Sequence, residues 1–158
     1  MKITMTRRGM LGLLATGLTA CTAEGPAYRP GSVEPTGNTG LIYVYRPLGT
    51  VATRGESPFL AIGGKSYGQI KAGSFVAAKV PEGEVKVMLQ QSLFLLIPTI
   101  PRYVTVSVVA GGSSYVRVDQ KISSADLSGG VTVNQSITIE EVSSEIGQAE
   151  LAATRENG

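Results

Sequence analysis

Few side chains of this 158-residue chain have the types or spacing that covalent or proton-transfer chemistry needs. The chain has no histidine, which excludes a Ser–His–Asp triad, a Cys–His pair and a histidine metal site. Glu140 and Glu141 are adjacent in an expected strand and therefore point to opposite faces. Glu82 and Glu84 flank a turn glycine, where we expect them to be solvated. We therefore predict no catalytic residues, no metal site, no cofactor and no enzymatic activity.

The single cysteine, Cys21, directly follows an uncharged apolar run from Gly9 to Ala20. A helix of about 12 residues is roughly 18 Å long, whereas the hydrocarbon core of a bilayer is about 30 Å thick. The run is therefore too short to span a membrane. The basic residues Lys2, Arg7 and Arg8 before it and the small residues at its end are typical of a secretory signal peptide, over residues 1–20.

The end of this signal resembles the lipobox of bacterial lipoproteins, and its residues are Leu18, Thr19, Ala20 and Cys21. The resemblance implies that the Cys21 thiol carries a diacylglyceryl group and that the chain is cut before it. The expected partner is then the membrane, held through an N-terminal lipid. The alternative is a soluble exported protein cut at Ala20 or Ala23, in which Cys21 has no role.

The sequence is consistent with two export routes, and it bears on which membrane holds the mature protein. Arg7 and Arg8 fit a twin-arginine export signal, but Gly12 stands where that signal usually has a lysine, so an ordinary secretory route is equally consistent. Thr22 follows the cysteine in place of the aspartate that retains lipoproteins in the inner membrane of enteric bacteria. We therefore expect a cell-envelope protein, on the outer membrane facing the periplasm if the cell has two membranes.

The charge of the mature chain gives no case for a nucleic-acid partner. The whole chain has 14 basic and 12 acidic residues, and loss of Lys2, Arg7 and Arg8 with the signal leaves 11 basic residues. A nucleic-acid interface would need a clustered basic face.

Composition divides the mature chain into three parts. Residues 21–40 are rich in proline and glycine, so we expect a lipidated cysteine followed by a flexible tether that spans roughly 25 Å. We expect residues 41–154 to form the folded domain and residues 155–158 to form a disordered tail.

Short alternating runs separated by glycine-rich turns indicate an all-β fold, a small antiparallel β-sandwich of about seven or eight strands. The runs are 41–46, 59–62, 66–70, 74–80, 84–90, 102–109, 114–121 and 131–142, before a short C-terminal helix within 143–154.

The folded part resembles the bacterial family called domain of unknown function 2846, often found in small lipoproteins. The match rests on the opening strand Ile42–Pro47, the hairpin segment Gly68–Gly73, the Pro81-Glu82-Gly83 turn and the ending Val142–Leu151. It covers about residues 40–152. The resemblance implies a small β-rich envelope domain and supplies no active-site residues.

Two features interrupt this regular pattern. Arg46 ends an apolar strand in phase with Val44, and we expect its head group to reach water at the rim of the sheet. A buried Arg46 paired with Asp119 or Asp126 is the alternative. Residues 92–101 are strongly apolar, and their prolines prevent a regular central strand. We expect core from 93 to 97 and exposure from 98 to 101; an exposed apolar stretch would be a contact with the membrane or an envelope protein through Phe94, Leu95, Leu96 and Ile97.

These features predict a lipid-anchored envelope domain that acts as a non-catalytic binding or structural accessory module. The alternative is a carrier that holds a lipid or another hydrophobic ligand in an apolar pocket near residues 92–101.

Overall fold

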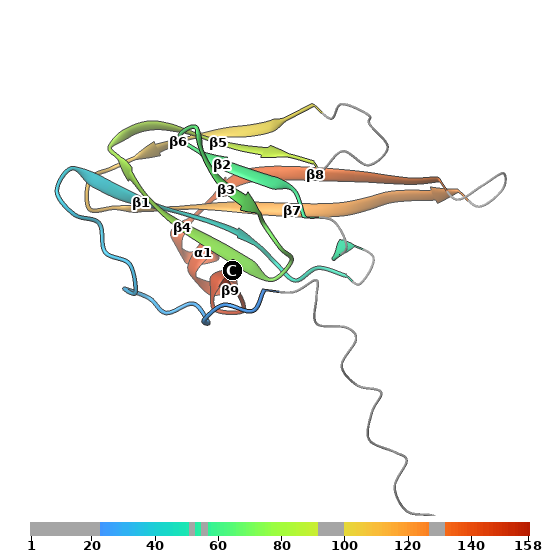
Figure 1. Ribbon diagram of the computed structural model, residues 1–158, viewed down its shortest axis with the longest axis horizontal. Coiled ribbons are helices and arrows are strands. Elements are labelled where there is room, and N and C mark those ends of the chain that lie inside the picture. Colours follow the sequence, from blue (N-terminus) through green and yellow to red (C-terminus); the bar gives the residue numbers. More distant parts are fainter. Residues whose placement is uncertain (1–22, 51–52, 55–56, 92–99, 127–131) are drawn as a thin grey trace, which may run out of the picture.

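The computed structural model describes residues 23–50, 53–54, 57–91, 100–126 and 132–158. They form nine strands and one helix, arranged as two stacked sheets with a third, thinner layer on the outside of one of them (Figure 1). This arrangement confirms the small all-β sandwich with a short C-terminal helix.

The larger sheet is mixed, and it has the strand order β8-β7-β1-β4-β9. Its strands are β1 (Thr39–Arg46), β4 (Ser74–Pro81), β7 (Ser113–Asp126), β8 (Thr132–Val142) and β9 (Arg155–Glu156). The smaller sheet is antiparallel, in the order β3-β2-β5-β6. Its strands are β2 (Phe59–Ile62), β3 (Lys65–Gln69), β5 (Gly83–Gln90) and β6 (Arg102–Val108). The helix α1 (Ser144–Leu151) follows β8.

Parallel pairing occurs twice in the mixed sheet. β1 pairs with β7 in parallel, with Tyr43 opposite Tyr115, and β4 pairs with β9 in parallel. Between β1 and β7 the chain forms all four strands of the smaller sheet and returns once to the mixed sheet to add β4, before β7 is placed beside β1. A parallel pair needs such a long crossover, and the alternation of side chains does not reveal which strands it joins.

The main core lies between the two sheets and is filled by aliphatic side chains, as the alternating pattern predicts. Val85, Val87 and Leu89 of β5 are buried, whereas Glu84, Lys86 and Gln90 are exposed. Val106 of β6 and Val116 and Val118 of β7 are completely buried against them. The period of two therefore predicted the inward face of each of these strands correctly.

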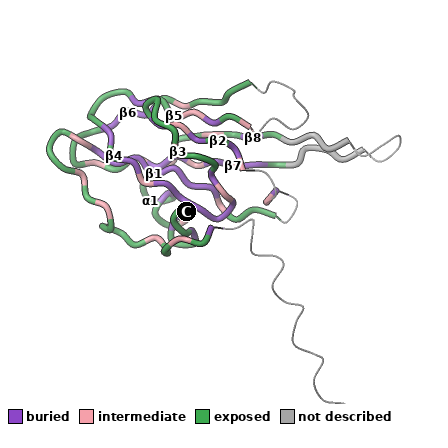
Figure 2. Tube along the Cα trace, viewed as in Figure 1, coloured by how far each residue is buried: buried purple, intermediate pink, exposed green. Residues whose placement is uncertain are grey.

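The mixed sheet is buried on its outer face as well. Every residue from Leu41 to Arg46 is buried, as the colour of β1 in Figure 2 shows, so β1 must be covered from both sides. The outer cluster is aromatic rather than aliphatic, and it comprises Leu41, Tyr43, Tyr45, Phe75, Tyr115 and Leu151. A continuous apolar strand such as Leu41–Tyr45 is typical of burial on both faces.

Two segments supply this outer cover, α1 and residues 23–38, which we call the strap. The strap differs from the flexible tether expected over residues 21–40. Tyr28 meets the rings of Tyr43 and Phe75 edge to face at 5.7 and 5.6 Å, and the Tyr28 amide donates to the Thr154 carbonyl at 3.2 Å. One aromatic side chain and a few backbone hydrogen bonds thus hold this segment on the sheet, although its composition is that of a flexible linker.

The C-terminal residues also differ from the disordered tail expected at 155–158. Arg155 and Glu156 form β9, whose edge carries the antiparallel bridge between Ala27 and Arg155. Asn157 continues the order, because its amide donates to the Phe75 carbonyl at 2.9 Å. The two ends of the folded chain therefore lie side by side (Figure 1).

Candidate functional site

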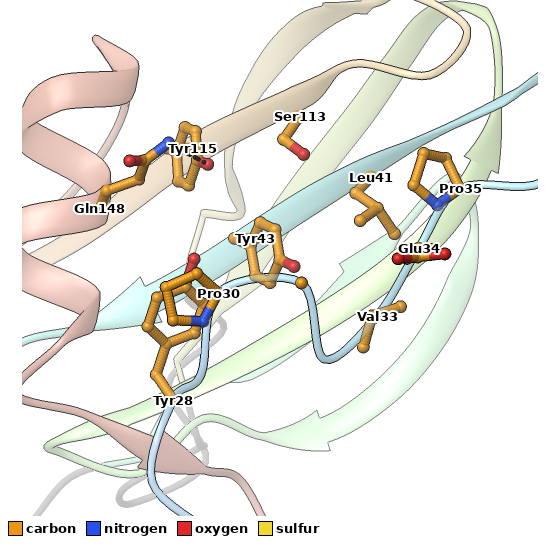
Figure 3. Close-up of a pocket in the computed structure, with 11 residues that line it drawn as sticks. Tyr28, Pro30, Val33, Glu34, Pro35, Leu41, Tyr43, Ser113, Tyr115 and Gln148 are labelled. Carbon is orange, nitrogen blue, oxygen red and sulfur yellow. Dashed lines mark hydrogen bonds between the residues drawn. The ribbon is translucent and has the colours of Figure 1, made fainter.

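A groove opens where the strap crosses the outer face of the mixed sheet beside α1 (Figure 3). It has a volume of about 270 Å³. Its floor is formed by Leu41 and Tyr43 of β1 and by Ser113 and Tyr115 of β7. Gln148 of α1 closes one side, and the strap supplies the other with Tyr28, Pro30, Gly31, Val33, Glu34 and Pro35.

Three tyrosines dominate the groove, and their rings are largely occupied by one another. Tyr43 and Tyr115 are stacked, with centroids 5.6 Å apart and planes 10° apart. This pairing follows from the parallel register, which places the two residues directly opposite each other. An ordinary tyrosine, with a pKa of about 10, is already protonated at neutral pH, and burial raises the pKa of Tyr28 and Tyr43 further. The groove therefore offers neutral hydroxyls rather than open ring faces.

Hydrogen bonds fix α1 over the tyrosines. The Gln148 side-chain amide donates to the Tyr115 hydroxyl at 3.1 Å, as Figure 3 shows. Further along the helix the Tyr45 hydroxyl donates to Glu150 at 2.6 Å, and the same carboxylate lies 3.5 Å from Arg117 Nε. Burial, and then the bond to Glu150, raises the pKa of Tyr45. These polar contacts anchor the helix on the sheet.

Gly147 lets the helix approach the sheet closely. A β-carbon there would stand 2.4 Å from Cγ of Tyr115, so only glycine fits. Ser143 caps the helix by accepting from the Ile146 amide at 3.4 Å. A glycine that weakens the helix in isolation thus brings the helix into contact with the sheet.

Arg46 lies elsewhere, and the prediction of an exposed head group at the rim was wrong. The residue is only 2% exposed, and its guanidinium donates to the Ile70 carbonyl at 3.3 Å, to the Thr53 carbonyl at 2.5 Å and to the Gln120 side chain. Asp119 instead contacts Lys121 at 3.3 Å. Arg46 therefore joins the loop after β1 to β7, which is a structural role.

The residues singled out for chemistry mostly fall beyond the described part of the chain. The described part begins after the signal and lipobox residues Arg7, Arg8, Leu18, Thr19, Ala20 and Cys21. The gap after β5 contains the expected contact residues Phe94, Leu95, Leu96 and Ile97. Next to that gap Ile100 is 82% exposed and Pro101 is exposed, as expected there. The groove is the site that sequence reasoning missed, because residues 23–38 were expected to be free.

Two features are absent from the described residues. These residues contain no cluster of three acidic, cysteine or histidine side chains able to hold a metal ion. None of their helices has the length and apolar character required to cross a membrane. The polar side chains that line the groove include Glu34, Ser113 and Gln148, which can donate or accept hydrogen bonds.

Comparisons with protein-family models, curated proteins and solved structures found no match to this chain. The resemblance to the domain of unknown function 2846 family therefore stays a prediction.

Proposed function

We propose that this protein is a lipid-anchored domain of the bacterial cell envelope that acts by binding another envelope component. The observation that carries the proposal is the sequence Leu18-Thr19-Ala20-Cys21 at the end of a short apolar run with basic residues before it. A soluble exported protein would need neither the cysteine nor its place at the end of the run.

The anchor is tested by Cys21→Ser, which keeps the size of the residue and removes the thiol that lipid would modify. We expect the wild-type chain to incorporate a metabolically supplied fatty acid and the variant to incorporate none. Thr22→Ser is the matched control, because it changes the next residue and leaves the thiol. A Cys21→Ser protein that is still labelled and membrane-bound would refute the anchor.

Binding rather than catalysis is supported by the groove under the strap. Its three tyrosine hydroxyls, the Gln148 amide and the Glu34 carboxylate are hydrogen-bonding groups, and Leu41 and Val33 add apolar surface. Its volume of about 270 Å³ is below the roughly 300–1,000 Å³ of sites that enclose a drug-sized ligand. The groove is therefore suited to a short part of a larger partner and is too small to enclose a lipid.

Partner binding is tested by purifying the intact lipoprotein from membranes and identifying copurifying proteins. Glu34→Lys reverses a charge on the exposed wall of the groove, and Glu24→Lys makes the same change on an exposed residue that does not line it. We expect Glu34→Lys to lose the partner and Glu24→Lys to keep it. Equal recovery in both variants would remove the groove from the proposal.

A further inference from the structure

We propose that the corner of the domain where the two chain ends meet lies directly on the membrane, so that the domain has one fixed orientation. This terminal corner comprises Ala23, Gly25, Lys71, Arg155 and Gly158. The inference rests on the proposed lipid at Cys21 and adds the surface of the domain that meets the lipid headgroups.

The first step is that the chain is bound to the folded domain from Ala23 onwards, two positions after Cys21. A β-carbon on Gly25 would stand 2.3 Å from the Glu156 carbonyl oxygen, so the two backbones are in direct contact. The Glu156 amide donates to the Pro26 carbonyl at 2.8 Å, and the Arg155 guanidinium donates to the Gly25 carbonyl at 3.4 Å. Ala23, the first described residue, is already buried.

The second step is that this corner belongs to the rigid part of the mixed sheet. The Arg155 amide donates to the Gly73 carbonyl at 3.0 Å, which ties β9 to the start of β4. The Asn157 side chain accepts from the Lys71 amide at 3.0 Å and donates to the Gln69 carbonyl at 2.8 Å. The corner therefore cannot move without the sheet.

The length of chain between Cys21 and Ala23 then decides whether the domain stands away from the membrane or lies directly on it. Only Thr22 lies between Cys21 and Ala23, and the two residue steps that join them span at most about 7 Å when fully extended. The headgroup layer on each side of a bilayer is itself roughly 5–8 Å thick. A free tether of 19 residues would instead have spanned about 25 Å. With its acyl chains in the bilayer, Cys21 therefore holds the terminal corner at the headgroups.

The opposite end of the sheet must then point away from the membrane. β4 starts beside Arg155 and runs eight residues to Pro81, about 25 Å at 3.3 Å per residue. Glu82 follows, and its amide donates to the Asn38 carbonyl at that far end. Two basic side chains, Lys71 and Arg155, lie at the terminal corner together with two acidic ones, Glu24 and Glu156. Because the charges are mixed, the contact requires no anionic lipid.

The test uses the full lipidated chain, purified from membranes and reconstituted in uncharged phosphatidylcholine vesicles. Cys21 is the only cysteine and lipid occupies its thiol, so one introduced cysteine is the sole free thiol. Lys71→Cys places it at the terminal corner, and Glu82→Cys places it at the far end. Each carries a fluorophore, and a fraction of the phospholipid carries a quencher on its headgroup.

We expect several-fold stronger quenching at position 71 than at position 82. A spacer of ten Gly and Ser residues between Thr22 and Ala23 should remove the difference, since it reaches roughly 17 Å. Equal quenching at both positions without the spacer, in protein shown to be lipidated, would overturn the orientation and leave the anchor intact. Absence of fatty acid from the same samples would instead refute the anchor itself.

Discussion

The ring of Tyr115 lies against Gly147 so closely that no other residue fits at that helix position without displacement. Tyr115 is held from its other face by the stacked ring of Tyr43. The contact therefore joins the helix, β7 and β1 in one packed column, and its two tyrosine rings form part of the floor of the groove.

We predict that Gly147→Ala destabilises the protein even though alanine is the better helix former. Alanine gains up to about 1 kcal/mol of helix propensity, whereas forcing a methyl group into a filled contact costs about 1–3 kcal/mol. The added methyl would meet Cβ and Cγ of Tyr115, which cannot swing away. The free energy of unfolding, measured with urea, should fall by about 1–2 kcal/mol.

Ala149→Gly is the matched control for this prediction. Ala149 is exposed in the same helix, so its replacement reports propensity alone, at a cost of about 1 kcal/mol. A Gly147→Ala protein that is more stable than the wild type would show that the helix packs less closely on the sheet than the structure indicates.

The sheet faces were predictable from the sequence, whereas the third layer was not. Val85, Val87 and Leu89 alternate with exposed residues, and a period of two has one physical interpretation in a half-buried strand. The strap carries no periodicity, and a proline- and glycine-rich composition is shared by free linkers and by extended segments laid on a surface. What distinguishes it is Tyr28, whose partners Tyr43 and Phe75 lie 15 and 47 residues away in the chain.

The burial of Arg46 was also beyond sequence reasoning. Its phase with Val44 correctly indicated the inward face, but its acceptors include carbonyl groups of Thr53 and Ile70, whose positions depend on loop geometry. Backbone carbonyls are present at every residue, so no sequence pattern marks the ones that receive a buried guanidinium. The same applies to the Gly73 and Phe75 carbonyls that hold the C-terminal residues.

We predict that the protein loses stability in alkali through its buried tyrosines. Burial and the bond to Glu150 raise the pKa of Tyr45 above its ordinary value of about 10. Above pH 10 the unfolded chain therefore releases a proton that the folded chain retains. The stabilisation is complete below pH 10 and falls by about 1.4 kcal/mol per pH unit for each such tyrosine until the folded pKa is reached.

Tyr45→Phe tests this assignment because it removes the titrating hydroxyl and leaves the ring. We expect the variant to be less stable at pH 7, by about 1.5–3 kcal/mol for a hydrogen bond to a charged group. Its loss of stability between pH 10 and pH 11 should be smaller than that of the wild type, as urea unfolding at each pH would show. An unchanged slope would mean that Tyr45 titrates normally in the folded protein.

The last prediction concerns the mutual support of the two chain ends, tested in chains that lack the signal peptide and begin at Ala23. Removing residues 23–37 takes away Tyr28 and its two edge-to-face contacts, each worth about 0.5–1.5 kcal/mol beyond area, together with backbone hydrogen bonds. Removing residues 155–158 takes away β9 and the bonds of Asn157. Each deletion should lower the free energy of unfolding by several kcal/mol.

The two deletions should not add, because the Gly25–Tyr28 segment and residues 154–156 hold each other. Either deletion already breaks the bonds of the Glu156 amide to Pro26 and of the Arg155 guanidinium to Gly25, so the second cannot break them again. We expect the double deletion to cost at least 1 kcal/mol less than the sum of the single deletions, a coupling well above the usual error for independent sites. Simple additivity would mean that the strap is held by Tyr28 alone and that the contacts of Gly25 and Pro26 with β9 contribute no stability. The inference that Cys21 lies close to a rigid part of the sheet would then lose its support.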